Sequence, residues 1–192
     1  MKFRLFVLLL MILFQSCNLF ETREPEAPAA ENQWNSFPIH PDSTLNNLKL
    51  VYNEQKYLVK YEAIFSDDFV FYFDNLDVEE YGVPVSWQSE SEINYLNNLY
   101  NDSNIKSVEL QLSEIDSEPD EEYYDYLEEY YIYREYKLII DNKSDSLSNE
   151  YEGKCVLHLK TNDDHIWKIF EWFDYKEESN WTWGRLKNEY SY

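Results

Sequence analysis

Histidine, cysteine and glycine, which supply most metal and phosphate chemistry in proteins, are scarce in this sequence. The three histidines, His40, His158 and His165, are separate from one another, whereas zinc and similar metals favour clustered His and Cys ligands. Only three of the 192 residues are glycine, so neither a glycine-rich phosphate loop nor a Gly-x-Ser-x-Gly nucleophile elbow is present. We therefore expect no bound metal and no cofactor.

Two carboxylic acids, Glu171 and Asp174, stand out because they lie in an aromatic stretch, whereas most other acids lie at turns or on polar strand faces. A catalytic carboxylate needs a shifted pKa and must face its substrate. Asp174 comes at the end of the stretch, where we expect it to hold a turn or to pair with Arg185. The sequence therefore predicts no catalytic residue.

Tyrosines gather with acids between residues 123 and 136. The tyrosines are Tyr123, Tyr124, Tyr126, Tyr130, Tyr131, Tyr133 and Tyr136. A tyrosine offers an apolar ring with a polar tip at low entropic cost, so such surfaces bind partners or sugars well. The alternative is that tyrosine is a general strand residue of this chain, which contains 18 of them. We favour the second interpretation.

The element on which the other elements are expected to depend is a hairpin over residues 154–174. Its first strand alternates, with Cys155, Leu157 and Leu159 on one face, and an Asn/Asp turn follows. The second strand is apolar on both faces. One face has Trp167, Ile169 and Phe173, and the other has Ile166, Phe170 and Trp172. A strand that is apolar on both faces belongs inside a sheet, and we expect Cys155 to be a buried core residue.

Helices are predicted in the first half of the chain. Leu45, Leu48 and Tyr52 have helical spacing behind a capping Asp/Ser/Thr cluster, and a second short helix follows at 58–65. A third helix begins at Ser89, where Ser89 and Glu92 have the spacing of a capping box.

Five strands complete the prediction, with an irregular segment at 83–87. The strands cover 69–73, 108–113, 130–141 and the two arms of the hairpin. From their alternation we expect four side chains to be almost inaccessible to solvent: Leu110, Leu138, Trp167 and Ile169.

The composition indicates one globular domain with an acidic surface. The chain has 38 Asp and Glu residues against 16 Lys and Arg, a formal net charge of −22. Nucleic acids and anionic lipids are bound through cationic surfaces, so both are excluded as partners of the domain. High charge also occurs in disordered chains, but 18% aromatic and 44% hydrophobic residues favour a folded core.

The N-terminus has the pattern of an export signal. Lys2 and Arg4 precede an apolar run, 5–14, which is too short to span a bilayer. The following Ser16-Cys17 resembles the end of a bacterial lipobox, in which the cysteine is lipidated. We expect a lipoprotein signal peptide at 1–16, lipidation at Cys17, a flexible tether at 17–39 and a single domain at 40–192. The alternative is an ordinary signal peptide with an incidental cysteine.

The order of elements resembles the cone-shaped nuclear-transport-factor-2-like (SnoaL-like) superfamily. The resemblance covers about residues 41–190 and is carried by 45–61, 69–73, 167–174 and 182–187, the last of which resembles the tail of uncharacterised bacterial lipoproteins of this group. It implies an α+β fold in which a curled antiparallel sheet wraps an N-terminal helix, with the helices in the N-terminal half. A lipocalin-like barrel would need about eight strands.

The resemblance leaves two function classes open. Some members of the superfamily are isomerases or dehydratases that use a buried acid and Tyr donors inside the cone. We favour a non-enzymatic module instead, anchored by lipid to a membrane of a bacterial envelope and binding a small apolar ligand or a protein partner.

If the cone binds a ligand, aromatic residues near its mouth should line the pocket. The residues expected there are Tyr52, Phe71, Trp87, Tyr136 and Trp172. The alternative is that these side chains fill the core and leave no cavity.

Overall fold

The computed structural model describes residues 33–124, 128–144, 148–177 and 181–191. The expected signal peptide, Cys17 and most of the expected tether lie outside the described residues, and so do the side chains of Tyr123, Tyr124 and Tyr126. No helix in the described ranges is long and apolar enough to cross a membrane. The described residues belong to one compact unit.

Residues before position 40 already pack against the rest of this unit. The ring of Trp34 stacks on that of Tyr57, with centroids 6.0 Å apart. The side chain of Asn47 accepts a hydrogen bond from the Asn35 amide and donates one to its carbonyl. Pro38 is buried and accepts a hydrogen bond from the backbone of Trp167.

Five helical segments have described bounds. They are α2 (Pro41–Asn53), the 3₁₀ helix η2 (Gln55–Ile64), α3 (Asn75–Tyr81), α4 (Ser89–Asn101) and α5 (Trp183–Glu189). Proline in the first turn starts α2, and its inner face buries Leu48, Val51 and Tyr52. Helix α3 was missed in the sequence because it has only seven residues. Its local signals are an Asp74 cap, which accepts from the Leu76 amide at 2.7 Å, and Gly82 with φ of 67° at its end.

Seven strands form one sheet. They are β1 (Phe65–Tyr72), β2 (Ser86–Gln88), β3 (Ile105–Glu114), β4 (Glu121–Tyr124), β5 (Glu128–Asn142), β6 (Asn149–Thr161) and β7 (Trp167–Tyr175). Their order is β2-β1-β7-β6-β5-β3, with β4 paired to β5. The expected count of five was too low because β2 and β4 are too short to show a period. The sheet is mostly antiparallel, but β1 and β7 pair in parallel.

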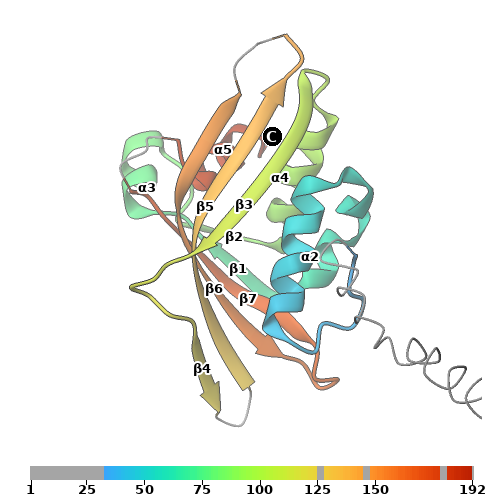
Figure 1. Ribbon diagram of the computed structural model, residues 1–192. Coiled ribbons are helices and arrows are strands. Elements are labelled where there is room, and N and C mark those ends of the chain that lie inside the picture. Colours follow the sequence, from blue (N-terminus) through green and yellow to red (C-terminus); the bar gives the residue numbers. More distant parts are fainter. Residues whose placement is uncertain (1–32, 125–127, 145–147, 178–180, 192) are drawn as a thin grey trace, which may run out of the picture. The chain divides into compact units, whose positions relative to one another are not determined.

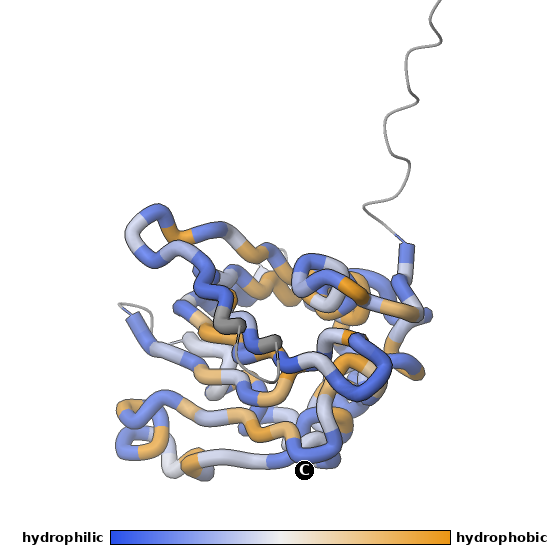
Figure 2. Tube along the Cα trace, turned by 90° about the horizontal axis from the view of Figure 1, so that it is seen from below, coloured by the Kyte–Doolittle hydropathy of each residue, from blue (hydrophilic) through white to orange (hydrophobic). Residues whose placement is uncertain are grey.

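Helices α2 and α4 lie on the same side of the sheet (Figure 1). Helix α2 packs on β3 and β7, and α4 packs on β1 and β3. Figure 2 shows that hydrophobic and hydrophilic positions follow one another closely along the trace. In β3 and in much of β6 buried positions recur at every second residue, as expected for strands with one face toward a core. The expected burial is confirmed for Leu110, Leu138, Trp167 and Ile169, which are all at most 4% exposed. Cys155 is also buried, at 1%.

A β-bulge changes the faces of β7. His158 pairs with Glu171 and the next residue, Leu159, pairs with Ile169, so Phe170 is the extra residue. After the bulge, Trp172 and Asp174 point into the core and Phe173 points outward. The prediction that Phe173 shares a face with Ile169 was therefore wrong, because a bulge reverses the alternation beyond it.

Gly153 of β6 pairs with Tyr136 of β5, and only a residue without a side chain fits beneath the Tyr136 ring. A Cβ atom at this position would lie 2.6 Å from the Tyr136 hydroxyl oxygen and 2.7 Å from the backbone oxygen of Tyr175. The missing side chain lets Tyr136 lie over the strand with its hydroxyl directed to the start of α5, where it accepts a hydrogen bond from the Trp183 amide at 2.8 Å.

Candidate functional site

Glu92 is a fully buried acid in the interior of the cone. It is the fourth residue of α4, and its side chain is 0% exposed. The capping-box interpretation was wrong: the N-cap is Gln88, and no side chain caps the helix. The carboxylate of Glu92 points inward and is bound there by a cation and by two aromatic side chains.

That cation is Lys187 of α5. Its Nζ atom lies 2.7 Å from Oε1 and 2.6 Å from Oε2 of Glu92, and both side chains are 0% exposed. Burial lowers the pKa of Lys187 to about 8, against the opposite effect of Glu92 and Asp174. A buried pair of this kind is held by its geometry and by further hydrogen bonds to the same groups.

Two other side chains donate hydrogen bonds to Glu92. The Tyr61 hydroxyl donates to Oε1 at 2.5 Å, and the Trp87 indole donates to Oε2 at 2.9 Å. Each carboxylate oxygen therefore accepts from Lys187 and from one aromatic side chain. An ionised carboxylate is an acceptor only, so these donors match what it needs.

Aromatic rings surround the ammonium group of Lys187. Its Nζ atom is 3.5 Å from the ring centroid of Phe71 and 3.9 Å from that of Trp172. The rings of Trp183, Tyr95 and Trp87 follow at 5.4, 5.6 and 5.9 Å. Cation–π attraction is strongest when the cation is desolvated, as here, and contributes about 2 kcal/mol in such cases.

Tyrosine hydroxyls extend this polar cluster. Those of Tyr52 and Tyr61 are 3.2 Å apart, and the Trp183 indole donates to Tyr52 at 3.2 Å and to Tyr95 at 3.3 Å. Burial raises the pKa of all three tyrosines well above the ordinary value of 10. Their hydroxyls therefore keep their protons at neutral pH and act as hydrogen-bond donors.

Asp174 is the second buried acid. Its Oδ2 atom accepts a hydrogen bond from the Gly184 amide at 2.6 Å, at the start of α5. Burial raises the pKa of Asp174 to about 7, although the Tyr136 hydroxyl and the Gly184 amide act in the opposite direction. Asp174 was expected to hold a turn or to pair with Arg185, and in the structure it binds the backbone of helix α5 at Gly184. The Arg185 guanidinium pairs instead with Glu189, at 3.2 Å.

The five residues predicted to line a pocket are all buried. Phe71 contacts the rings of Trp87 and Trp172, with centroids 6.0 and 5.5 Å away. Tyr52, Tyr136 and Trp172 each contact the ring of Trp183, with centroids 5.1, 5.0 and 4.4 Å away. The fold thus brings the five together, with Trp183 and Lys187 of α5 between them. The ligand pocket stays a prediction.

Sequence reasoning missed Glu92, Trp183 and Lys187. The signal for the last two was available: Trp183, Leu186 and Lys187 have the i, i+3, i+4 spacing of one helical face. The apolar face of a short amphipathic helix packs on the core, so a lysine on that face must find a buried partner.

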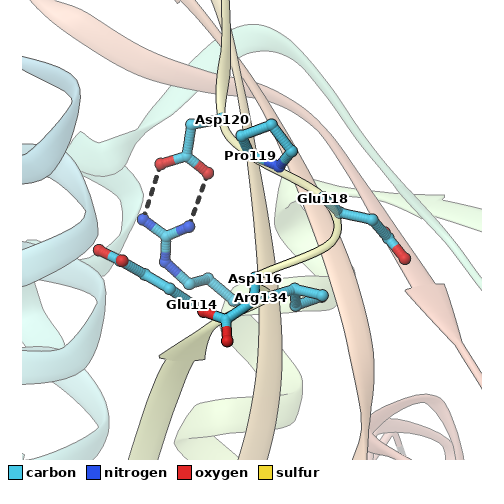
Figure 3. A pocket seen from close by; sticks show the side chains of 7 residues that line it. Glu114, Asp116, Glu118, Pro119, Asp120 and Arg134 are labelled. Atoms are coloured by element: carbon cyan, nitrogen blue, oxygen red, sulfur yellow. Dashed lines mark hydrogen bonds and ion pairs between the residues drawn. The ribbon is translucent and has the colours of Figure 1, made fainter.

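Three surface cavities are formed by described residues. In one, of about 300 Å³, the guanidinium of Arg134 forms two parallel hydrogen bonds with Asp120, at 2.6 and 2.8 Å, which neutralises it (Figure 3). Another, of about 310 Å³, includes Tyr136 and Gly153 in its lining. The third, of about 380 Å³, lies beside Lys160 and Phe170. The other four predicted pocket residues border none of these three cavities.

Within the described ranges no group of three or more His, Cys, Asp or Glu side chains is placed to hold a metal.

We predict that Lys187→Met lowers the free energy of unfolding by about 3–5 kcal/mol, because the Glu92 carboxylate loses its partner while remaining buried. Urea denaturation measures this change. Lys137→Met is the matched control: that lysine pairs with Glu150 and Glu152 at the surface, and the substitution should cost less than about 1 kcal/mol. Adding Glu92→Gln to Lys187→Met should recover part of the loss. Equal effects of the two lysine substitutions would contradict the assignment.

We also predict a pH dependence that Asp174 causes. Because its pKa rises from 3.8 to about 7 on folding, the folded chain binds more protons than the unfolded chain in this window. Its contribution to the free energy of unfolding therefore falls as pH rises from about 4 to 7, by at most about 4 kcal/mol. Asparagine at position 174 keeps a side-chain oxygen that can accept the hydrogen bond from the Gly184 amide, but it does not titrate. The free energy of unfolding of wild type minus that of Asp174→Asn should therefore fall as pH rises across the window, whereas exposed Asp163→Asn should not change the profile. A constant difference would refute the prediction.

Comparison with known proteins supports the fold. No family model and no curated protein matches the chain. A conserved protein from Planctomyces limnophilus matches with a TM-score of 0.51 and 11% identity, over 69% of this chain and 89% of its own. A structure assigned as a scytalone dehydratase from Novosphingobium aromaticivorans matches with a TM-score of 0.50 and 9% identity, over 75% of this chain and 91% of its own. A nuclear-transport-factor-2-like superfamily protein from Salmonella enterica matches with a TM-score of 0.49 and 10% identity, over 71% of this chain and 88% of its own. Together with the order of its elements, the likenesses that score 0.50 or more show that the chain has an α+β fold in which N-terminal helices pack on a mostly antiparallel sheet.

Proposed function

We propose that this chain is a non-enzymatic interaction module, anchored by lipid to a bacterial envelope membrane, that meets a protein partner through the outer face of its sheet. The observation that carries the proposal is the occupied interior. Trp183 and Lys187 lie among the residues that would otherwise line a pocket, and their contacts are at van der Waals and hydrogen-bond distances.

The acids of the interior bind groups of the chain itself, although one oxygen each of Asp77 and Asp174 has no hydrogen-bond partner among the described residues. A catalytic acid or base must come within hydrogen-bond reach of a substrate proton. Glu92 accepts from Lys187, Tyr61 and Trp87, and Asp174 is 2% exposed and binds the backbone of α5. These contacts favour the module over the alternative of an isomerase or dehydratase that uses an acid and tyrosines inside the cone. The likeness to a structure assigned as a dehydratase, at 9% identity, concerns the fold alone.

The outer face of the sheet carries an apolar row. Tyr72 pairs with Phe173, Phe173 with Val156, and Val156 with Tyr133, so the row crosses β1, β7, β6 and β5 at one register. All four side chains are half-buried, and the rings of Tyr72 and Phe173 stack with centroids 4.7 Å apart. Aromatic side chains of this kind supply much of the binding energy in protein interfaces.

Paired charges lie beside this outer row. The adjacent row contains His158, which is held between the carboxylates of Glu171 at 2.8 Å and Glu129 at 3.2 Å and stacks on Tyr131. Lys160 pairs with Glu129 at 3.2 Å. The face therefore presents both signs of charge around an apolar centre, although the whole chain has a net charge of −22. An apolar centre with a mixed polar rim is the pattern of a protein interface, and a net charge this negative opposes nucleic acid and anionic lipid.

The anchor rests on the N-terminal sequence. A short apolar run that ends at Ser16-Cys17 supports export and lipidation of Cys17, and the proline-containing segment after it supports a tether. A tether would leave the outer row free to meet a partner in the aqueous space next to the membrane.

We predict that Cys17→Ser moves the protein from the membrane to the soluble fraction, or leaves the signal peptide uncleaved. Cell fractionation with immunoblotting measures both outcomes. Cys155→Ser, at the buried cysteine, is the control and should leave partitioning unchanged. Membrane association of Cys17→Ser equal to that of the wild type would show that the anchor assignment is wrong.

We predict that a photocrosslinking amino acid in place of Tyr133 gives a discrete adduct with another protein in cells, and that Val156→Glu abolishes it. The same amino acid in place of Tyr81, which is 37% exposed on α3, is the matched control and should give no such adduct. Equal adduct yields at the two positions, or an adduct that persists with Val156→Glu, would count against the outer row as the interface.

A further inference from the structure

The surroundings of the Lys187 ammonium group are built almost entirely by other elements. Phe71 comes from β1, Trp87 from β2, Glu92 and Tyr95 from α4, and Trp172 from β7. These five residues form what we call the ammonium cage. We propose that the cage is a recognition site for a primary alkylammonium group, and that Lys187 is the intramolecular ligand that occupies it. This proposal is independent of the outer row.

The cage has the two parts that recognition of an ammonium group requires. The Glu92 carboxylate supplies the opposite charge and accepts hydrogen bonds at 2.6 and 2.7 Å. Aromatic faces at 3.5 and 3.9 Å supply cation–π attraction in place of water. A neutral hydroxyl of the same size would leave the buried carboxylate without a counter-charge, which is costly.

The carboxylate is held in place without help from the lysine. Tyr61 and Trp87 each donate a hydrogen bond to one of its oxygens, and both donors lie outside α5. The Tyr61 hydroxyl is in turn 3.2 Å from that of Tyr52. The acceptor therefore keeps its orientation when the Lys187 side chain is removed, which is the preorganisation that a binding site needs.

Helix α5 is also held by contacts that do not involve Lys187. Its first turn is fixed by hydrogen bonds from Thr182 to Asp77, from the Trp183 amide to Tyr136, and from the Gly184 amide to Asp174. At its other end the backbone of Tyr190 accepts a hydrogen bond from the Asn98 side chain at 2.9 Å. Lys187→Ala should therefore leave α5 docked and open a space between its Cβ atom and Glu92. The atoms removed correspond to one n-propylammonium ion.

The test uses the full chain with Lys187→Ala and n-propylammonium chloride as the probe. The midpoint of thermal unfolding should rise with probe concentration in the millimolar range, as mass action requires for a ligand that binds the folded state. Sodium chloride at equal ionic strength and 1-propanol at equal concentration should give no comparable rise. The wild type should not respond, because Lys187 already fills the cage.

The double variant Glu92→Gln with Lys187→Ala separates ammonium recognition from simple filling of a cavity. It should lose at least tenfold in apparent affinity for n-propylammonium. If Lys187→Ala is unfolded alone, n-propylammonium and not 1-propanol should restore the native circular dichroism spectrum. The proposal is overturned by an equal response to 1-propanol, by an equal response of the wild type or of the double variant, or by a Lys187→Ala chain that gains nothing from the amine.

Discussion

A single buried ion pair constrains this structure more than any other contact. Lys187 and Glu92 lie 95 positions apart in the sequence, and removing either one leaves the other as an unpaired buried charge, which is costly because that charge has lost its water. The pair fixes α5 against α4, and through Tyr61, Trp87 and Phe71 it also fixes η2, β2 and β1 around the same point. Segments from both ends of the domain therefore meet at one carboxylate.

The aromatic composition suits this arrangement. An interior that contains a charge needs groups that are apolar in bulk and polar at one point, and tyrosine and tryptophan have both properties. Tyr52, Tyr61 and Tyr95 place their rings in the core and their hydroxyls in the hydrogen-bond network around Glu92 and Trp183. Tyr52 is also one of the five residues predicted to line a pocket, and its ring contacts that of Trp183.

The proposed interface lies on the outer face of the sheet, opposite the buried pair. In the interior Glu92 is paired with Lys187, whereas one oxygen each of Asp77 and Asp174 has no hydrogen-bond partner among the described residues. On the outer face Tyr72, Phe173, Val156 and Tyr133 lie in one row because the β-bulge at Phe170 turned Phe173 outward. One extra residue in β7 thus affects both sides of the sheet: it directs Trp172 and Asp174 toward α5 and places Phe173 in the outer row.

The α+β cone was implied by the resemblance of the element order to a known superfamily. The sequence by itself determined the long hairpin, the first helix and the burial of Leu110, Leu138, Trp167 and Ile169. These features follow from alternation or helical spacing within one segment, which neighbouring residues encode. The tertiary structure alone decided the partners of the buried charges. Ser89 and Glu92 have the spacing of a capping box, but the carboxylate lies in the core, where Lys187, Tyr61 and Trp87 bind it. The bulge at Phe170 likewise arises from pairing with β6, and β2 and β4 exist only because a neighbouring strand supplies their hydrogen bonds. Local patterns record which face of an element is buried, whereas the identity of the group it meets depends on residues far away in the chain.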